Sequence, residues 1–296
     1  MEPPVSRSIA ADELDTKPIV SDNKPKISAT PRRSIVSAPN VIAAVMEENY
    51  NTTNSKRGTA LIFNHVSFTD KTIREGSMKD CDSIERALKK LEFDVRIWTD
   101  ETKENIIKIL EKVAKEDHSD HDCLVVVVMT HGGRDDLAAS DKSYDVEKLW
   151  KPFLGNGSPS LIGKPKLFFI QACRGTEVDA GVKVGNIVAD TVDSSPIAEL
   201  KFVIPTMADV LVMYSTYDGH YSWRNPVNGS WFIQALSDEL ESNAHRKELL
   251  QMLTTVSRVV AYQYQSNVPD NEKMDAKKQM PCVVSMLTRA LYFPPK

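Results

Sequence analysis

Two side chains that can do chemistry together, a thiol and an imidazole, each follow a strongly apolar segment. The run VVVVMT leads into His131 and Gly132, and the run LFFIQA leads into Cys173. A thiol becomes a strong nucleophile as its thiolate, and a nearby imidazole can take its proton and later return one to a leaving amine. If both runs are parallel strands, their carboxyl ends bring the two side chains to one edge of a sheet.

This chemistry also needs donors for the negative charge that develops on an attacked carbonyl oxygen. Gly132 lets a carbonyl approach closely, so its N–H and the N–H of Cys173 are the candidate donors. The spacing alone is equally compatible with a polar strand cap at His131 and an ordinary core cysteine at position 173.

The segments around these residues predict the sheet that the chemistry requires. Apolar runs typical of buried strands alternate with amphipathic helical segments. The predicted strands are TALIFNHV, FDVRIW, CLVVVVMT, KLFFIQA, DVLVMYST and CVVSMLT. The predicted helices cover about residues 80–91, 103–115, 145–153, 230–242 and 245–262. Such alternation predicts an α/β fold with a mostly parallel six-stranded sheet and helices on both faces.

Two segments depart from this alternation. Residues 1–54 are rich in Pro, Ser and charge, which predicts a flexible leader. Residues 174–204 also lack a sustained apolar period and far exceed the usual connection of about 4–6 residues. We therefore expect a leader at 1–54, a larger piece at 55–193 with its linker from about 176, and a smaller piece at 194–296 that shares the same fold.

Composition excludes several classes of function. The chain has 37 Lys and Arg against 41 Asp and Glu and no basic run, which argues against nucleic-acid binding. No apolar run approaches the roughly 20 residues of a membrane span, and no secretory signal opens the chain, so we expect a cytoplasmic protein. The four cysteines form no CxxC pair, so we expect no metal or cofactor, and we expect Cys81, Cys123 and Cys282 in the core.

The residues around the thiol carry a resemblance to a known family. The pentapeptide from Gln171 to Gly175, QACRG, resembles the active-site signature of caspases, and His131 lies at a suitable distance upstream. The resemblance runs from about residue 57 to 293, and the chain looks like an insect-like executioner caspase zymogen. It implies a three-layer sandwich and a cysteine endopeptidase that cuts proteins after aspartate, with a preference for DxxD, during apoptosis. It also implies a dimer of large and small subunit pairs joined along the last strand, an upstream initiator caspase, and restraint by inhibitor-of-apoptosis proteins.

The resemblance assigns roles to further residues. A selective pocket for a carboxylate needs paired, charge-assisted hydrogen bonds, and Arg74, Gln171 and Arg224 match the family's aspartate pocket. Thr72 matches the residue whose carbonyl orients the histidine. The remaining positions implied to contact substrate are Thr130, Tyr221, Ser222, Trp223, Asn225 and Trp231. By pattern alone either arginine is more often a surface residue, and Trp231 is more often a core residue.

Some positions depart from the family pattern. Gly133 stands where many relatives have an acidic residue, and the loop GRDDLAASD that begins there is unusual. Met274 replaces an aromatic residue that usually closes the second pocket. We therefore expect a different rim around the site.

Two Asp-x-x-Asp sequences lie in segments expected to be flexible. One ends at Asp15 in the leader and the other at Asp193 in the linker, with Asp179 and Asp190 as alternative linker cuts. We expect a zymogen that cleavage in the linker activates. The alternatives are a catalytically inactive caspase-like regulatory partner, a peptidase that cuts after basic residues or asparagine, and a nucleotide-binding protein. The chain retains Cys173 and His131, and it lacks GxGxxG and GxxxxGK[ST].

Overall fold

The computed structural model describes residues 47–179 and 205–296. Its centre is a six-stranded sheet in the order β10, β7, β6, β3, β1, β2. The strands are β1 (Lys56–Asn64), β2 (Asp94–Thr99), β3 (His121–Met129), β6 (Lys166–Gln171), β7 (Val210–Tyr214) and β10 (Cys282–Ser285). Neighbours are parallel except β10, which runs antiparallel to β7. The α/β class and the mostly parallel six-stranded sheet are confirmed.

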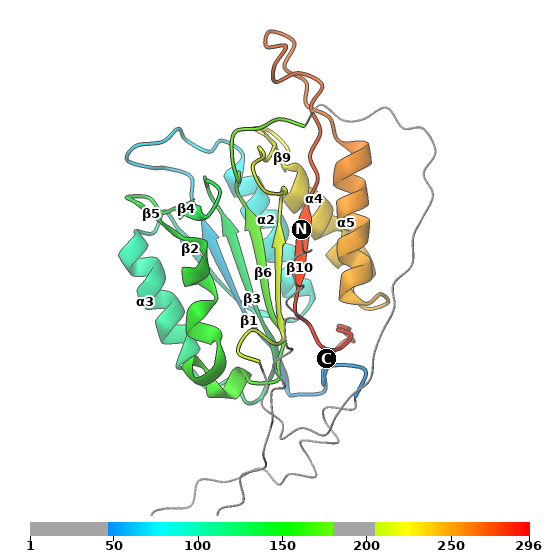
Figure 1. The fold of residues 1–296 in the computed structure, drawn as a ribbon. Coiled ribbons are helices and arrows are strands. Elements are labelled where there is room, and N and C mark those ends of the chain that lie inside the picture. Colours follow the sequence, from blue (N-terminus) through cyan, green and yellow to red (C-terminus); the bar gives the residue numbers. More distant parts are fainter. Residues whose placement is uncertain (1–46, 180–204) are drawn as a thin grey trace, which may run out of the picture. The chain divides into compact units, whose positions relative to one another are not determined.

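Helical elements cover both faces of the sheet, as the sequence predicted (Figure 1). On one face lie α2 (Ser77–Lys90), α4 (Trp231–Asn243) and α5 (Leu249–Gln263), and on the other lie α3 (Lys103–Ala114) and short 3-10 turns. Within β3, Val125 and Val127 join the first core, while Val126 and Val128 join the second. A strand buried on both faces must be apolar throughout, which is why its sequence shows no alternation.

The short helix that we expected over residues 145–153 is wrong in type. The segment forms two 3-10 turns, η1 (Val146–Leu149) and η2 (Lys151–Phe153). Pro152 lies in the first positions of the second turn, and a proline has no N–H to continue an α-helix. Two further turns, η3 (Gly155–Gly157) and η4 (Pro159–Leu161), lead to β6.

The start of the folded part lies earlier than the sequence suggested. Residues 47–54 were expected to belong to the flexible leader, yet Tyr50 is buried. Its hydroxyl donates to Asp209 Oδ1 at 2.7 Å, and its N–H donates to the Ala290 carbonyl at 2.9 Å. A single aromatic residue within a polar segment gives no periodic signal, so the sequence did not predict this packing.

The last strand is less buried than we expected. Val283 packs on the core that contains α4 and α5, but Val284 is 45% exposed. Cys282 is only partly buried, which corrects its expected place in the core, whereas Cys81 and Cys123 are buried as expected. The strand is at the edge of the sheet, and Val284 belongs to neither hydrophobic core of the described residues.

Two small hairpins that the sequence analysis did not predict stand beside the sheet. One pairs β4 (Asp136–Ala138) with β5 (Ser143–Asp145), and the other pairs β8 (Arg224–Asn225) with β9 (Gly229–Ser230). Their strands of two or three residues are too short to show a period of two. Within the described residues, no helix is long and apolar enough to cross a bilayer.

A buried carboxylate joins α2 to the hairpin formed by β8 and β9. Asp80 accepts a hydrogen bond from the Ser230 N–H at 2.7 Å and another from the Ser230 hydroxyl. Gly229 has φ +96°, and a Cβ there would lie 2.3 Å from Asp80 Oδ1. A residue without a side chain is therefore required for the carboxylate to reach the start of α4.

We expect replacement of Asp80 by alanine to lower the free energy of unfolding by about 2 kcal/mol, because two buried donors of Ser230 lose their acceptor. Urea denaturation of the full chain measures this loss. Asp82→Ala, at an exposed position of the same helix, is the matched control. Equal stability of the two variants would contradict the assigned role of Asp80.

Candidate active site

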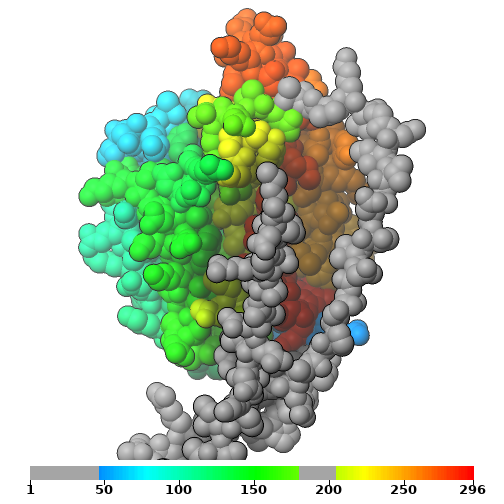
Figure 2. Space-filling model, viewed as in Figure 1, coloured from blue at the N-terminus to red at the C-terminus, as the bar shows by residue number. Residues whose placement is uncertain are grey.

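His131 and Cys173 reach the same edge of the sheet. They follow β3 and β6, which are parallel neighbours with Met129 beside Gln171 at their carboxyl ends. Both residues line one open cavity of about 480 Å³. Figure 2 shows the cyan, green and yellow segments of this end meeting at the upper surface of the molecule. The convergence inferred from two strand ends is therefore present in the fold.

The ring of His131 is held by one backbone group. Its Nε2 lies 2.8 Å from the Thr72 carbonyl oxygen, as the resemblance implied, and the ring of Phe68 lies 4.8 Å away between centroids. Because a carbonyl can only accept, Nε2 carries the hydrogen, and the neutral ring keeps its lone pair on Nδ1. This tautomer leaves Nδ1 able to take a proton from a neighbouring group.

The thiol of Cys173 is largely enclosed by a loop from the other side of the linker. The Ser222 N–H donates to its Sγ at 3.4 Å, and its Sγ lies 3.8 Å from the Ser222 carbonyl oxygen. Burial raises the pKa of Cys173, while the Ser222 N–H, Arg74 and Arg224 act in the opposite direction. The group is therefore a protonated thiol at neutral pH. The nearby N–H donor and the two cations stabilise the thiolate that forms when the proton leaves.

The imidazole is also neutral at neutral pH. Burial lowers the pKa of His131 and outweighs the hydrogen bond to the Thr72 carbonyl. Arg74, Arg224 and Lys71 lower it further by charge repulsion. A neutral imidazole next to a thiol can act as a general base, taking the proton as the sulfur attacks.

Gly132 brings the histidine loop into contact with the backbone around the thiol. A Cβ at this position would lie 2.7 Å from the Cys173 carbonyl oxygen and 3.0 Å from the Ala172 Cβ. The bridge between Gly132 and Leu137 uses the His131 carbonyl and the Gly133 N–H. The Gly132 N–H is not part of that pairing, so it is placed where a developing oxyanion could accept from it.

A buried guanidinium group acts electrostatically on the thiol. Arg74 is 1% exposed, and its Nη1 donates to the His65 carbonyl at 2.7 Å and to Ser77 Oγ at 2.8 Å. Its Nε and Nη2 are buried and have no partner among the described residues. Burial, followed by repulsion from Arg224, lowers the pKa of Arg74 to about 9. A buried cation that lacks hydrogen-bond partners favours the binding of a carboxylate.

Gln171 and Arg224 complete the surroundings of this guanidinium. The Gln171 Nε2 donates to Ser222 Oγ at 2.8 Å, while its Oε1 is buried without a partner. A half-turn of the amide would let the Ser222 hydroxyl donate instead and would present two N–H donors to a ligand. Arg224 is half-buried, and its Nε donates to the Glu75 carbonyl at 2.7 Å.

Aromatic side chains form a wall beside this pocket. Trp223 stacks on Trp231 with centroids 5.8 Å apart, and Trp231 stacks on Tyr264 at 5.4 Å. Trp231 is 7% exposed, so its side chain belongs to the core of the α4 face. Tyr221, which the resemblance also assigned to substrate contact, lines the cavity of the thiol.

Two other assigned residues have their side-chain oxygens engaged locally. The Thr130 hydroxyl is buried and donates to the Ala138 carbonyl at 2.6 Å, which fixes the β4 hairpin. The Asn225 Oδ1 accepts from the N–H groups of Val227 and Asn228 and closes the turn between β8 and β9. Asp15 and Asp193, the expected cleavage positions, lie outside the described residues.

Sequence reasoning missed Gln279, which links the thiol strand to the aromatic wall. Its side chain is 1% exposed, its Oε1 accepts from the Trp223 N–H at 2.5 Å, and its Nε2 donates to the Ser215 carbonyl at 2.7 Å. Ser215 Oγ in turn bonds both backbone groups of Ala172, next to the thiol. No local sequence pattern predicts the role of this residue, because its partners lie more than 50 positions away in the sequence.

An ion-paired cluster at the rim was also missed. Arg134 donates from Nε and Nη2 to Asp218 Oδ2 at 2.9 and 2.6 Å, and Arg174 Nη2 lies 3.5 Å from Asp218 Oδ1. Arg174 also stacks over the Tyr214 ring at 4.1 Å. The cluster joins the loops after β3, β6 and β7, although exposed ion pairs of this kind add little stability.

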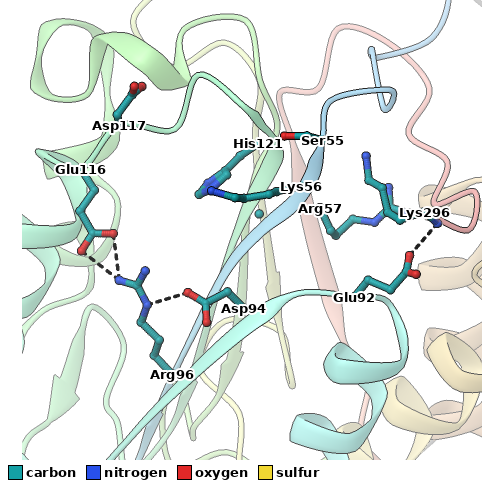
Figure 3. Close-up of a pocket in the computed structure, with 11 residues that line it drawn as sticks. Ser55, Lys56, Arg57, Glu92, Asp94, Arg96, Glu116, Asp117, His121 and Lys296 are labelled. Carbon is teal, nitrogen blue, oxygen red and sulfur yellow. Dashed lines mark hydrogen bonds and ion pairs between the residues drawn. The ribbon is translucent and has the colours of Figure 1, made fainter.

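A second cavity, of about 440 Å³, lies at the opposite edge of the sheet, where Lys56, Asp94 and His121 mark the amino ends of three strands. Three of its charged side chains pair with one another, and Figure 3 shows Arg96 between Asp94 and Glu116. No thiol is among the residues that line it. Within residues 47–179 and 205–296, no group of three His, Cys, Asp or Glu side chains is arranged to hold a metal ion.

The four cysteines differ in their capacity to react. Burial raises the pKa of Cys81 to about 11. It raises the pKa of Cys123 to about 12, because it outweighs the opposing charges of Arg57, Lys296 and Lys164. Both are therefore inert at neutral pH. Cys173, in contrast, shares its cavity with the imidazole of His131.

Comparison with known proteins agrees with this geometry. The family model described as the caspase domain matches residues 57–292. The chain belongs to the caspase family. It is 42% identical to caspase drICE of Drosophila melanogaster over 83% of this chain and 73% of that protein. It is 39% identical to caspase-7 of Gallus gallus over 89% of this chain and 85% of that protein.

A solved structure shares the fold. The crystal structure of caspase-1 from Spodoptera frugiperda superimposes with a TM-score of 0.78 at 40% identity, covering 85% of this chain and 97% of that chain. The caspase-like sandwich expected from the resemblance is thus confirmed, and this caspase is a cysteine-type peptidase of the apoptotic effector kind.

We expect Gln279→Ala to raise KM for a peptide substrate about tenfold with a smaller change in kcat, because Trp223 loses one buried acceptor that holds the substrate loop. Steady-state kinetics on the activated enzyme separates the two constants. Met280→Ala, which alters an exposed neighbouring side chain, is the control. A fall in kcat with an unchanged KM would contradict a positioning role.

Proposed function

We propose that Cys173 is the nucleophile and His131 the general base of an endopeptidase that cuts after aspartate. The neutral thiol attacks the scissile carbonyl carbon, its proton passes to His131 Nδ1, and that proton later leaves with the amine. The N–H groups of Gly132 and Cys173 donate to the oxyanion of the tetrahedral intermediate. The tautomer of His131, held by the Thr72 carbonyl, supports this direction of proton transfer.

The observation that carries the aspartate preference is the buried Arg74 with two unpaired nitrogen atoms beside the thiol. A substrate carboxylate accepts from this guanidinium and from Arg224, and the Gln171 amide turns to donate the remaining bond. Asparagine would leave the cations uncompensated, and a basic side chain would repel them. Six further residues belong to the same substrate cleft: Thr130, Tyr221, Ser222, Trp223, Asn225 and Trp231. Of these, Asn225 and Trp231 contact the fourth residue before the cut.

Peptides that differ only at the residue before the cut test this proposal. We expect cleavage after Asp to exceed cleavage after Glu, Asn or Arg by about a hundredfold or more in kcat/KM, since a site built for a charged group rejects analogues steeply. Cys173→Ala is expected to lower the activity by about a thousandfold or more. Equal cleavage of Asp and Arg peptides, or activity that survives the alanine, would refute it.

We also propose that the chain is a zymogen, cut after Asp15 in the leader and after Asp193 in the linker. The segment that follows Cys173 supports this, because Arg174 and Glu177 are hydrogen-bonded through their backbones to Gly219 and His220 across the linker. Loops from both sides of a cut thus share one site. The Asp179 carbonyl accepts from the Lys278 N–H at 2.8 Å, which favours a cut further along the linker.

Replacement of Asp193 by alanine tests this activation step. After treatment with an initiator-type protease, we expect the variant to stay uncut at that bond and to have activity at least about tenfold below that of the treated wild type, because linker release is coupled to loop rearrangement. Asp190→Ala, at the other end of the same tetrapeptide, is the comparison. Full activation of Asp193→Ala without another linker cut would refute the proposal.

The caspase family implies protein substrates and dimeric assembly. We place the dimer contact along β10, whose partly exposed edge supports it. Cytoplasmic location, activation by an initiator caspase and restraint by inhibitor-of-apoptosis proteins complete the proposal. An inactive regulatory role is not favoured, because the thiol, the imidazole and both arginines are present.

A further inference from the structure

The cavity at the thiol extends away from the arginine pocket. Most of its lining comes from the loop before Arg74, the histidine loop, the β4 and β5 hairpin, and the residues after Cys173, while Tyr221 closes it on the side of the loop that carries Arg224. The lining includes Lys71, His131, Asp136, Ser143 and Thr176 but none of the three aspartate-pocket side chains. A substrate whose aspartate enters that pocket must therefore cross the thiol and leave along this cavity with the residues that follow the cut.

The position of one carboxylate in this cavity, that of Asp136, depends on Gly133, a glycine that differs from the family pattern. The Gly133 N–H donates to the Asp136 carbonyl at 3.0 Å, which closes a tight turn before β4. A Cβ at Gly133 would lie 2.3 Å from Asp136 Oδ1, closer than any real contact of that kind. Any other residue at position 133 would displace the carboxylate. The loop that differs from the family pattern thus places a negative charge at this point.

The charge of Asp136 is not neutralised by a neighbour. Among the described residues, its side chain makes no hydrogen bond and no ion pair, whereas nearby Arg134 is engaged by Asp218. Lys71, the cation on another wall of the cavity, lies 3.9 Å from Asp70 Oδ2, and no ion pair joins it to Asp136. Among the residues that the structure describes, the cavity therefore offers one carboxylate without a direct cationic partner to the departing part of a substrate.

We infer that Asp136 determines specificity for the first two residues after the cut, favouring a basic side chain there and disfavouring an acidic one. The inference rests on the proposed function, because it concerns substrates held by the aspartate pocket. The chain's own sequence offers a contrast: Thr16 and Lys17 follow the leader site, while Ser194 and Ser195 follow the linker site. The leader bond thus carries the favoured charge, and the linker bond carries none.

Three peptides built on the leader site test the inference, each with Asp-Glu-Leu-Asp before the cut. They continue with Thr-Lys, Thr-Gln or Thr-Glu, and kcat/KM is measured for the activated wild type, Asp136→Asn, Gly133→Ala and Asp135→Asn. We expect the wild type to prefer Lys over Glu by about tenfold in kcat/KM. This is the size of effect expected from one carboxylate that lies close to the substrate charge in a cavity open to water. The ratio should fall to about two in Asp136→Asn and in Gly133→Ala. Asp135→Asn, an exposed neighbour, should keep the wild-type ratio.

The ratio within each variant is the readout, so a general loss of activity does not affect the result. Raising the salt concentration from about 0.05 M to about 0.5 M should shrink the wild-type ratio toward one, which requires no variant at all. An equal Lys-to-Glu ratio in the wild type and Asp136→Asn, or a ratio insensitive to salt, would overturn the inference. An aspartyl amide with a fluorescent leaving group has no residue after the cut. If the wild type fails to cleave it, the proposed function fails instead.

Discussion

The site depends on a cation that the fold buries without giving it a full set of partners. Arg74 is almost wholly enclosed, yet only one of its three nitrogen atoms is hydrogen-bonded within the described residues. Desolvation of a guanidinium is costly, and the lowered pKa of Arg74 reflects that cost. The surrounding structure keeps the side chain in place through the His65 carbonyl and Ser77, and through the negative charge of Asp80. In the proposed function, a substrate carboxylate would relieve this unfavourable state, which accounts for the proposed selectivity.

The same arrangement affects the two reacting groups. Arg74 and Arg224 lower the pKa of Cys173 and that of His131, so they favour thiolate and neutral imidazole together. Burial acts against the thiolate but in favour of the neutral imidazole. When a substrate carboxylate neutralises the two cations, their help to the thiolate diminishes and the imidazole becomes more basic. These two changes act in opposite directions on the transfer of a proton from the sulfur to the imidazole.

The sequence predicted what depends on local pattern. Continuous apolar runs identified the strands of the sheet, and the rule that parallel strands end at one edge brought Cys173 and His131 together. Aspartate specificity came from the resemblance, since no local pattern distinguishes Arg74 from a surface arginine. Gln279, Asp80 and the ion pair of Arg134 with Asp218 could not be predicted, because each depends on how distant segments pack. Pro152 did offer a signal, since a proline within a short helical segment indicates a break.

One consequence follows from the position of β6 beside β7. These strands belong to opposite sides of the linker, yet they are hydrogen-bonded neighbours in register from Lys166 and Val210 onward, and both hydrophobic cores draw residues from each. The intact linker keeps each fragment at a high effective concentration near the other, and cleavage would remove only this effect. The large shared core holds the fragments together without it. The two fragments would therefore stay together as one folding unit. Peptide hydrolysis is not reversed by the enzyme in dilute water. A chain that is cut once in the linker would therefore stay in the cut state until it is degraded.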